Sequence, residues 1–320
     1  MKIIKCLPVF KDYLWGGEQM KNFYPNMNTP TPLAESWLLS ANKDGESVVC
    51  GGEYDGTLFG EYLNDIGKDA LGKNAAKFDF FPVLIKFIDA KLPLSIQVHP
   101  DDAYAMEHEK SYGKTEMWYI VDAAEDAFIY YGLSQDLSKQ EFESSIKNNS
   151  LTNYLNKIPV KNGDCFFIPS GTIHAIGAGT LIAEVQQNSN ITYRVYDYGR
   201  KDKDGNTREL HIDKAVDVTT LTKLNIISQS LSNTEPDVED NIQPLASCDY
   251  FNVERIIVDG HIELSVTDDS FQNLICVDGE ATIKCENQTL SFSKGESIFI
   301  PAQDIKYELI GQAVLLKTTV

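Results

Sequence analysis

Side chains that can bind a metal or move a proton gather in residues 94–118, which read LSIQVHPDDAYAMEHEKSYGKTEMW. In a β-strand, successive side chains point to opposite faces of the sheet. One strand here places Gln97 and His99 on the same face, and a second strand places Lys114 and Glu116 together. Polar rows of this kind are costly in an apolar core unless they have partners. They predict two strands that direct these four side chains at one site.

A second histidine, His174, follows well after Glu116 in the segment GDCFFIPSGTIHAIG. Either histidine alone has an ordinary explanation as a hydrogen-bonded structural residue. Two imidazoles, a carboxylate and an amide oxygen together suit Zn²⁺, and these ligand types also accept Fe²⁺, Mn²⁺ or Co²⁺. We therefore expect Gln97, His99, Glu116 and His174 to bind one metal ion per chain.

The positions of three basic residues bear on the same site. Lys86 lies within the apolar run FFPVLIKFIDA, where it either reaches an edge of the sheet or lines the pocket. Arg194 shares its strand face with Thr192 and Tyr196, so it faces either solvent or the barrel interior. Lys114 points to the side of Glu116, and a lysine beside a divalent cation can act as acid, base or phosphate anchor.

Composition limits the class of protein. The chain has 320 residues and a formal net charge of −19, and it contains no Lys/Arg stripe, which argues against a nucleic-acid or anionic-membrane partner. The six cysteines form no C-x2-C pair, so we expect reduced core residues. The sequence has no apolar run long enough to span a membrane and no signal-peptide pattern in its first segment, MKIIKCLPVFKDYLWGG. These features predict a soluble, cytoplasmic protein.

Two further patterns describe the organisation of the chain. Residues 134–158 read as helical, with the capping box Ser138-Lys139-Gln140-Glu141 and a second helix expected from the apolar spacing between 151 and 158. Residues 228–242 are polar and suit a linker. Beyond it the pattern is strand-like, and Ser293–Lys306 repeats Lys161–His174 at a constant offset.

The repeat retains the framework of the first copy and loses its ligand. Gly295 and Pro301 correspond to Gly163 and Pro169, but Lys306 occupies the position of His174. We therefore expect residues 243–320 to form a second, ligand-free barrel that binds no metal.

The spacing G-x5-P-x-G-x2-H that ends at His174 is a signature of the cupin barrels. Several segments resemble the type I mannose-6-phosphate isomerases in their short bacterial form, in the order FPVLIKFIDA, LSIQVHPDD, GKTEMWYI, PSGTIHAIGAGTLIAEVQQNS and TYRVYDYGR. The resemblance implies a mainly β double cupin, that is, two jelly-roll barrels with a small helical insertion. It places zinc on Gln97, His99, Glu116 and His174.

The same resemblance implies roles for the remaining candidates. Arg194 and Lys114 are the expected catalytic residues, and Lys86 and Ser95 the expected substrate-binding residues. Relative to a general cupin, Gln97 replaces the first histidine of His-x-His, and Glu116 follows His99 at a much wider spacing. The isomerases share both departures, which favours that family over metal-dependent dioxygenases.

From these observations we expect residues 1–133 and 159–227 to form the metal-binding barrel, 134–158 an insertion, 228–242 a linker and 243–320 the second barrel. The expected function is the interconversion of D-mannose 6-phosphate and D-fructose 6-phosphate by metal-assisted proton transfer through an enediolate. The alternatives are a metal-dependent cupin oxygenase and a non-catalytic sugar-binding cupin. A phosphorylated hexose is the expected partner, and the oligomeric state is open.

Overall fold

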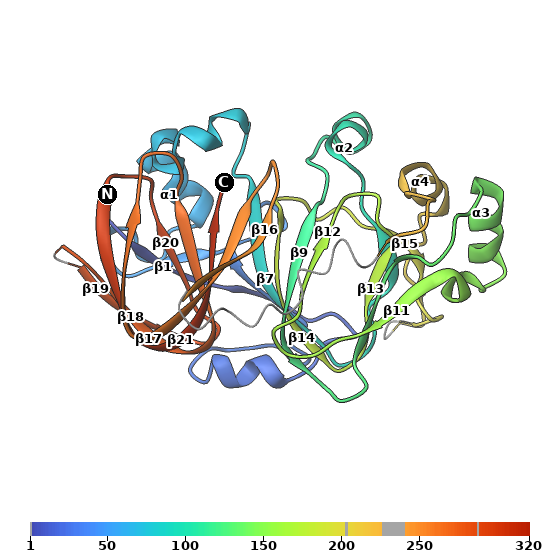
Figure 1. Cartoon of the computed structure of the whole chain (residues 1–320), viewed down its shortest axis with the longest axis horizontal. Coiled ribbons are helices and arrows are strands. Elements are labelled where there is room, and N and C mark those ends of the chain that lie inside the picture. Colours follow the sequence, from blue (N-terminus) through green and yellow to red (C-terminus); the bar gives the residue numbers. More distant parts are fainter. Residues whose placement is uncertain (1, 202–203, 226–240, 287) are drawn as a thin grey trace.

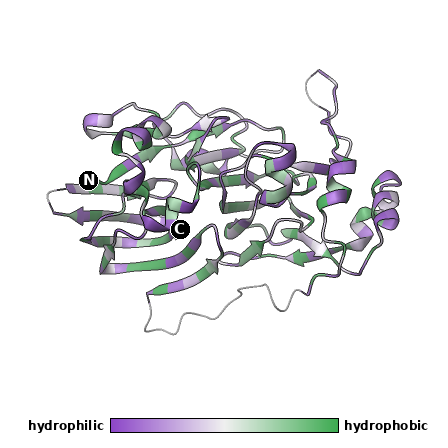
Figure 2. Cartoon of the chain, turned by 90° about the horizontal axis from the view of Figure 1, so that it is seen from above, coloured by the Kyte–Doolittle hydropathy of each residue, from purple (hydrophilic) through white to green (hydrophobic). Residues whose placement is uncertain are grey.

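The computed structural model describes residues 2–201, 204–225, 241–286 and 288–320. Two β-rich bodies lie side by side along the long axis of the molecule (Figure 1). The mainly β architecture that the sequence predicts is therefore confirmed. Hydrophobic residues concentrate in the strands, whereas the peripheral helices and loops are largely hydrophilic (Figure 2).

The first body holds the candidate residues and consists of two antiparallel sheets. The six-stranded sheet has the order β12 (Cys165–Ile168), β9 (Glu116–Ala123), β14 (Thr180–Gln187), β7 (Val83–Ala90), β3 (Glu35–Leu39), β2 (Val9–Lys11). The five-stranded sheet has the order β11 (Leu155–Pro159), β10 (Phe128–Leu133), β13 (His174–Ile176), β8 (Ile96–Val98), β15 (Tyr193–Tyr196). A small ribbon joins β4 (Ala41–Asn42) to β5 (Gly45–Glu46). Side chains from both large sheets share one core cluster, so the sheets pack face to face.

The second body is one eight-stranded antiparallel sheet. Its order is β16 (Ile242–Ser247), β17 (Asn252–Val266), β21 (Ile305–Thr319), β18 (Gln272–Cys285), β20 (Ser297–Ile300), β1 (Ile4–Leu7), β6 (Val48–Cys50), with β19 (Gln288–Ser293) paired to β18. Strands β1 and β6 come from the N-terminal part of the chain, which we expected in the other barrel, and β1 pairs with β20. This sheet therefore crosses the expected domain boundary, and the division into domains stays a prediction.

The helices lie at the periphery of the two bodies. They are α1 (Phe59–Ile66), α2 (Asp102–His108), α3 (Lys139–Lys147) and α4 (Ile212–Val218), with 3₁₀ turns η1 (Gln19–Phe23), η2 (Gly52–Tyr54), η3 (Lys68–Leu71), η4 (Lys73–Lys77) and η5 (Leu151–Tyr154). No helix in the described ranges is long and apolar enough to cross a membrane. The expected linker at 228–242 falls outside the described residues except for its last two positions.

One expected helix of the insertion is confirmed and the other is wrong. α3 begins at the predicted capping box, in which the side chains of Ser138 and Glu141 each accept a hydrogen bond from the other residue's backbone. The second expected helix is the short turn η5 followed by strand β11, which pairs with β10. Pairing with an exposed strand edge outweighs the weak local preference for helix.

The internal repeat corresponds to matching structure in the two bodies. Strands β12 and β20 occupy equivalent positions in the two copies of the repeat. The glycines that precede them, Gly163 and Gly295, have φ of 87° and 95°. Only glycine adopts this region without strain, which explains why both copies retain it.

Candidate active site

Three of the four expected metal ligands meet inside the first body. His99 directly follows β8, Glu116 opens β9 in the opposite sheet, and His174 opens β13. One ligand atom of each of these residues lies within 4.8 Å of the others, and all three side chains are buried. Residues far apart in sequence thus converge because each stands at the end of a strand and the two sheets face one another.

Hydrogen bonds orient both imidazoles toward the carboxylate. Nδ1 of His99 lies 2.7 Å from the carbonyl oxygen of Ile191, and Nδ1 of His174 lies 2.8 Å from that of Thr172. Burial lowers the pKa of both histidines well below the usual value, so the rings are neutral. A ring that donates through Nδ1 leaves a lone pair on Nε2, which is the arrangement of a metal ligand.

Two facing polar atoms of this cluster lack hydrogen bonds. Nε2 of His174 and Oε2 of Glu116 are buried without a hydrogen-bond partner and lie 3.6 Å apart. Such atoms are rare in folded proteins because leaving them unpaired is costly. A divalent cation between them would satisfy both, and two nitrogens with one oxygen match the ligands of zinc. The residues therefore fit the expected metal.

The structure places the fourth expected ligand, Gln97, beside this cluster. On β8, Gln97 lies opposite His174 of the neighbouring strand β13 and opposite Arg194 of the neighbouring strand β15. Its Oε1 accepts a hydrogen bond of 3.3 Å from the hydroxyl of Ser95. Its role as a ligand stays a prediction.

Lys114 is buried within the cluster. Its ammonium forms an ion pair with Glu116 and lies 3.3 Å from Nε2 of His99 and 3.6 Å from Oε1 of Glu184. Burial lowers the pKa of Lys114 to about 8, while Glu184 acts in the opposite direction. The predicted pocket lysine is thus in contact with the candidate ligands.

Lys86 lies deeper in the same network and does not reach an edge of the sheet. The residue is 5% exposed, and its Nζ lies 3.0 Å from Oε1 of Glu184 and 3.6 Å from Oε2 of Glu35. Burial alone would lower the pKa of Lys86, but the two carboxylates raise it above its ordinary value. Lys86 is therefore a charged residue held between two acids.

Two acidic residues of this network, Glu184 and Glu35, were not predicted from the sequence. Glu184 lies opposite both Lys86 and Trp118 on neighbouring strands, and its Oε2 accepts a hydrogen bond of 2.7 Å from the indole of Trp118. Glu35 accepts one of 2.6 Å from the indole of Trp37. The available signal for Glu184 was a single acid within the apolar strand TLIAEVQQ, the counterpart of Lys86 in its own apolar run.

Lys86→Met is expected to lower the free energy of unfolding by about 3–5 kcal/mol, because Glu35 and Glu184 would remain buried without their cation. Urea unfolding followed by circular dichroism measures the change. Lys73→Met is the matched control, since Lys73 forms an exposed ion pair of 2.7 Å with Asp268 and exposed pairs contribute little. Equal stability of Lys86→Met and the wild type would contradict a structural role for this network.

Arg194 lies on β15 of the five-stranded sheet, opposite Gln97 on β8. Its Nε donates to the hydroxyl of Ser95 at 3.2 Å, and its Nη1 donates to the carbonyl of Glu209 at 3.0 Å. Directly opposed residues of an antiparallel pair project to the same face, so Arg194 and Gln97 share a face. Ser95, Gln97 and Arg194 form the second half of the candidate site.

Further positive charge lies next to Arg194. Asp197 is buried and accepts hydrogen bonds from Nε of Arg200 at 3.1 Å and from Nε of Arg208 at 2.8 Å. Arg200 also donates to the carbonyl of Pro93 at 2.6 Å. Two guanidinium groups thus share one carboxylate, which leaves excess positive charge in a chain whose net charge is −19.

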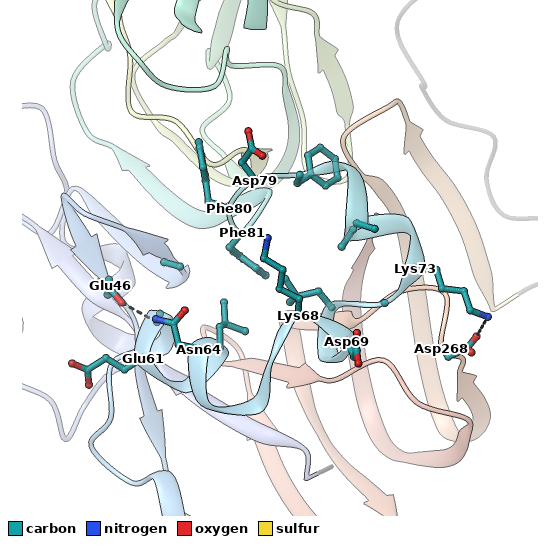
Figure 3. Close-up of a pocket in the computed structure, with 18 residues that line it drawn as sticks. Glu46, Glu61, Asn64, Lys68, Asp69, Lys73, Asp79, Phe80, Phe81 and Asp268 are labelled. Atoms are coloured by element: carbon teal, nitrogen blue, oxygen red, sulfur yellow. Dashed lines mark hydrogen bonds and ion pairs between the residues drawn. The ribbon is translucent and has the colours of Figure 1, made fainter.

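A large cavity lies elsewhere in the molecule. It has a volume of about 970 Å³ and is lined by residues of α1, η3 and η4, by the segment 78–81 and by Asp268 (Figure 3). The residues that line it include Lys68, Asp69 and the Lys73–Asp268 ion pair, but none of the residues of the candidate active site. This large cavity is therefore separate from the candidate active site.

Comparisons with known proteins identify the family of this chain. Residues 3–151 match the family model "Phosphomannose isomerase type I, catalytic domain", and residues 241–320 match "Mannose-6-phosphate isomerase, cupin domain". The chain is 37% identical to mannose-6-phosphate isomerase ManA of Bacillus subtilis, with 96% of this chain and 95% of that protein covered. It is 38% identical to the mannose-6-phosphate isomerase of Streptococcus mutans, with 90% and 89% covered.

A solved structure of a related protein has the same fold. The crystal structure of the mannose 6-phosphate isomerase from Bacillus subtilis superposes with a TM-score of 0.91 at 34% identity and covers both chains completely. The fold and the buried His/Glu/His cluster thus define a cupin with a candidate metal centre. The chain belongs to the type I phosphomannose isomerase family.

Proposed function

We propose that this protein interconverts D-mannose 6-phosphate and D-fructose 6-phosphate. The observation that carries the proposal is the buried cluster of His99, Glu116 and His174 with Lys114 against it. Relatives named mannose-6-phosphate isomerase match the chain over nearly its full length. No observation favours a cupin oxygenase or a non-catalytic sugar-binding protein.

The reaction moves a proton between C1 and C2 of the sugar and develops negative charge on an oxygen. His99, Glu116, His174 and, as a prediction, Gln97 would hold the metal, which when bound polarises the sugar oxygens. Arg194 supplies a fixed cation for the developing oxyanion. Lys114, which contacts Glu116 and His99, is the residue that we propose carries the proton.

The phosphate group requires cations that carboxylates do not already neutralise. Lys86 lies between Glu184 and Glu35, whereas Arg200 shares Asp197 with a second arginine. The excess charge therefore favours a phosphate position at Arg200, while Arg194, which is bonded to the hydroxyl of Ser95, is left for the oxyanion. Substrate binding by Lys86 stays a prediction.

The experiment that tests the function is a coupled assay for fructose 6-phosphate formed from mannose 6-phosphate. The same preparations are analysed for metal content and for oxygen consumption in an oxygen electrode. Isomerisation with stoichiometric zinc and without oxygen uptake is the expected result. Oxygen uptake with bound iron would instead favour the oxygenase. The preference for zinc and the cytoplasmic location stay predictions.

Isomerisation in deuterated water is expected to place some deuterium at C1 of fructose 6-phosphate or at C2 of mannose 6-phosphate. A single metal with cationic side chains suits an oxyanion intermediate, in which the migrating hydrogen passes through a base that exchanges with water. NMR or mass spectrometry of the product measures the label. Complete absence of label over many turnovers would support a hydride shift.

A further inference from the structure

We infer that His211 is a positioning residue for Arg194, because residue 211 holds the backbone of the strand that presents the arginine to the site. The inference rests on the proposed isomerase function, since Arg194 has a catalytic role only there. His211 did not enter the sequence-based site, and it lies beyond the charged turn that follows the strand of Arg194.

Strand β15, which carries Arg194, is the outermost strand of its sheet and, among the strands that the structure describes, pairs only with β8. An edge strand leaves backbone groups without a partner on its outer side. Here the backbone N–H of Arg194 donates to Nδ1 of His211 at 3.3 Å, and the backbone N–H of His211 donates to the carbonyl of Arg194 at 2.7 Å. His211 therefore takes the place of a neighbouring strand at this one residue.

This contact bears on the arginine side chain. Both backbone groups of Arg194 point outward, so Arg194 and Gln97 form a non-hydrogen-bonded pair, the type in which side chains approach most closely. The register of β15 against β8 also shifts between Arg194 and Tyr196. Pairing with β8 alone therefore holds Arg194 weakly, and the bonds to His211 supply the missing restraint.

The same short segment also holds the guanidinium group. Nη1 of Arg194 donates to the carbonyl of Glu209, just before His211 in the chain. The segment leads into α4, where Lys214 forms an ion pair of 2.6 Å with Glu109. Glu109 in turn accepts a hydrogen bond of 2.8 Å from the hydroxyl of Tyr193. Residues 209–211 thus bind both the backbone and the guanidinium group of Arg194. The ion pair of Lys214 with Glu109 in turn holds the helix that follows them.

The charge state of His211 is consistent with this role. Burial, assisted by Arg194 and Lys214, lowers its pKa, although Glu209 acts in the opposite direction with a carboxylate oxygen 3.9 Å from Nε2. The neutral ring with its proton on Nε2 presents Nδ1 as an acceptor, as the backbone N–H of Arg194 requires.

Three substitutions test the inference in the full-length, metal-loaded protein. His211→Leu removes the acceptor and is expected to lower kcat by about 10- to 100-fold, because small misplacements of a catalytic group are costly. His211→Asn places its amide oxygen near the position of Nδ1 and should restore turnover close to that of the wild type. His211→Gln carries its oxygen further out, near the position of Nε2, and should remain impaired. The exposed His261→Leu, in β17, is the matched control and should behave as the wild type.

A double-substitution cycle separates positioning from general damage. In an Arg194→Ala background, His211→Leu is expected to change kcat by less than about twofold, since the residue through which it acts is gone. A loss as large as in the wild-type background, or wild-type turnover in His211→Gln, would overturn the inference. If His211→Leu does not fold, the contrast between Asn and Gln still decides the question. Failure of the wild-type protein to isomerise mannose 6-phosphate would refute the proposed function instead.

Discussion

His174→Ala is expected to yield protein without stoichiometric metal and with turnover reduced about a thousandfold or more, because a bound metal contributes several kcal/mol of transition-state stabilisation. The substitution removes the buried Nε2 of His174, which has no hydrogen-bond partner among the described residues. His99 and Glu116 would then have to hold the ion with one nitrogen fewer. Elemental analysis and the coupled isomerase assay on one preparation measure both effects.

The control for this experiment lies in the second body. His261 forms an exposed cluster with Glu263 and Glu308, and it is the site where an adventitious ion would bind. We expect His261→Ala to retain the metal content and activity of the wild type. Circular dichroism should show that His174→Ala remains folded, since the core does not depend on the ion alone. A full equivalent of zinc with near-normal activity in His174→Ala would refute the metal site.

The clustering of His99, Glu116 and His174 could be predicted because it depends on local rules. Alternation along a strand sets the face of each residue, and the glycine and proline around β12 set the turn before His174. The backbone N–H of Gly171 donates to the carbonyl of His99 at 2.8 Å, which ties this turn to the end of β8. Strong local signals thus predicted that these three candidate ligands lie together.

The partners of Lys86 could not be predicted in the same way. Glu184 meets Lys86 because β14 pairs with β7 in one particular register, although the two residues are far apart in the sequence. The alternation of polar and apolar residues within one strand does not indicate which strand pairs with it, or in which register. The same limitation applies to β1, which lies near the start of the chain and pairs with β20 near its end.

Arg194→Ala is expected to lower kcat by about 100- to 1000-fold, the range for removal of a group that stabilises a developing oxyanion. KM should change little, because an interaction that grows with charge contributes more in the transition state than in the bound substrate. Steady-state kinetics of the metal-loaded variant separates the two parameters.

Arg194→Lys distinguishes charge from geometry at the same position. Lysine retains the positive charge but lacks the planar fork that bonds Ser95 and the carbonyl of Glu209 at once. We therefore expect Arg194→Lys to lie between the wild type and Arg194→Ala in kcat. Arg255→Ala serves as the control and should not change turnover, because Arg255 lies on β17 in the eight-stranded sheet of the second body. Since Ser95 and Glu209 hold the guanidinium from two sides, unchanged turnover in Arg194→Ala would mean that this arrangement is structural and that another cation stabilises the oxyanion.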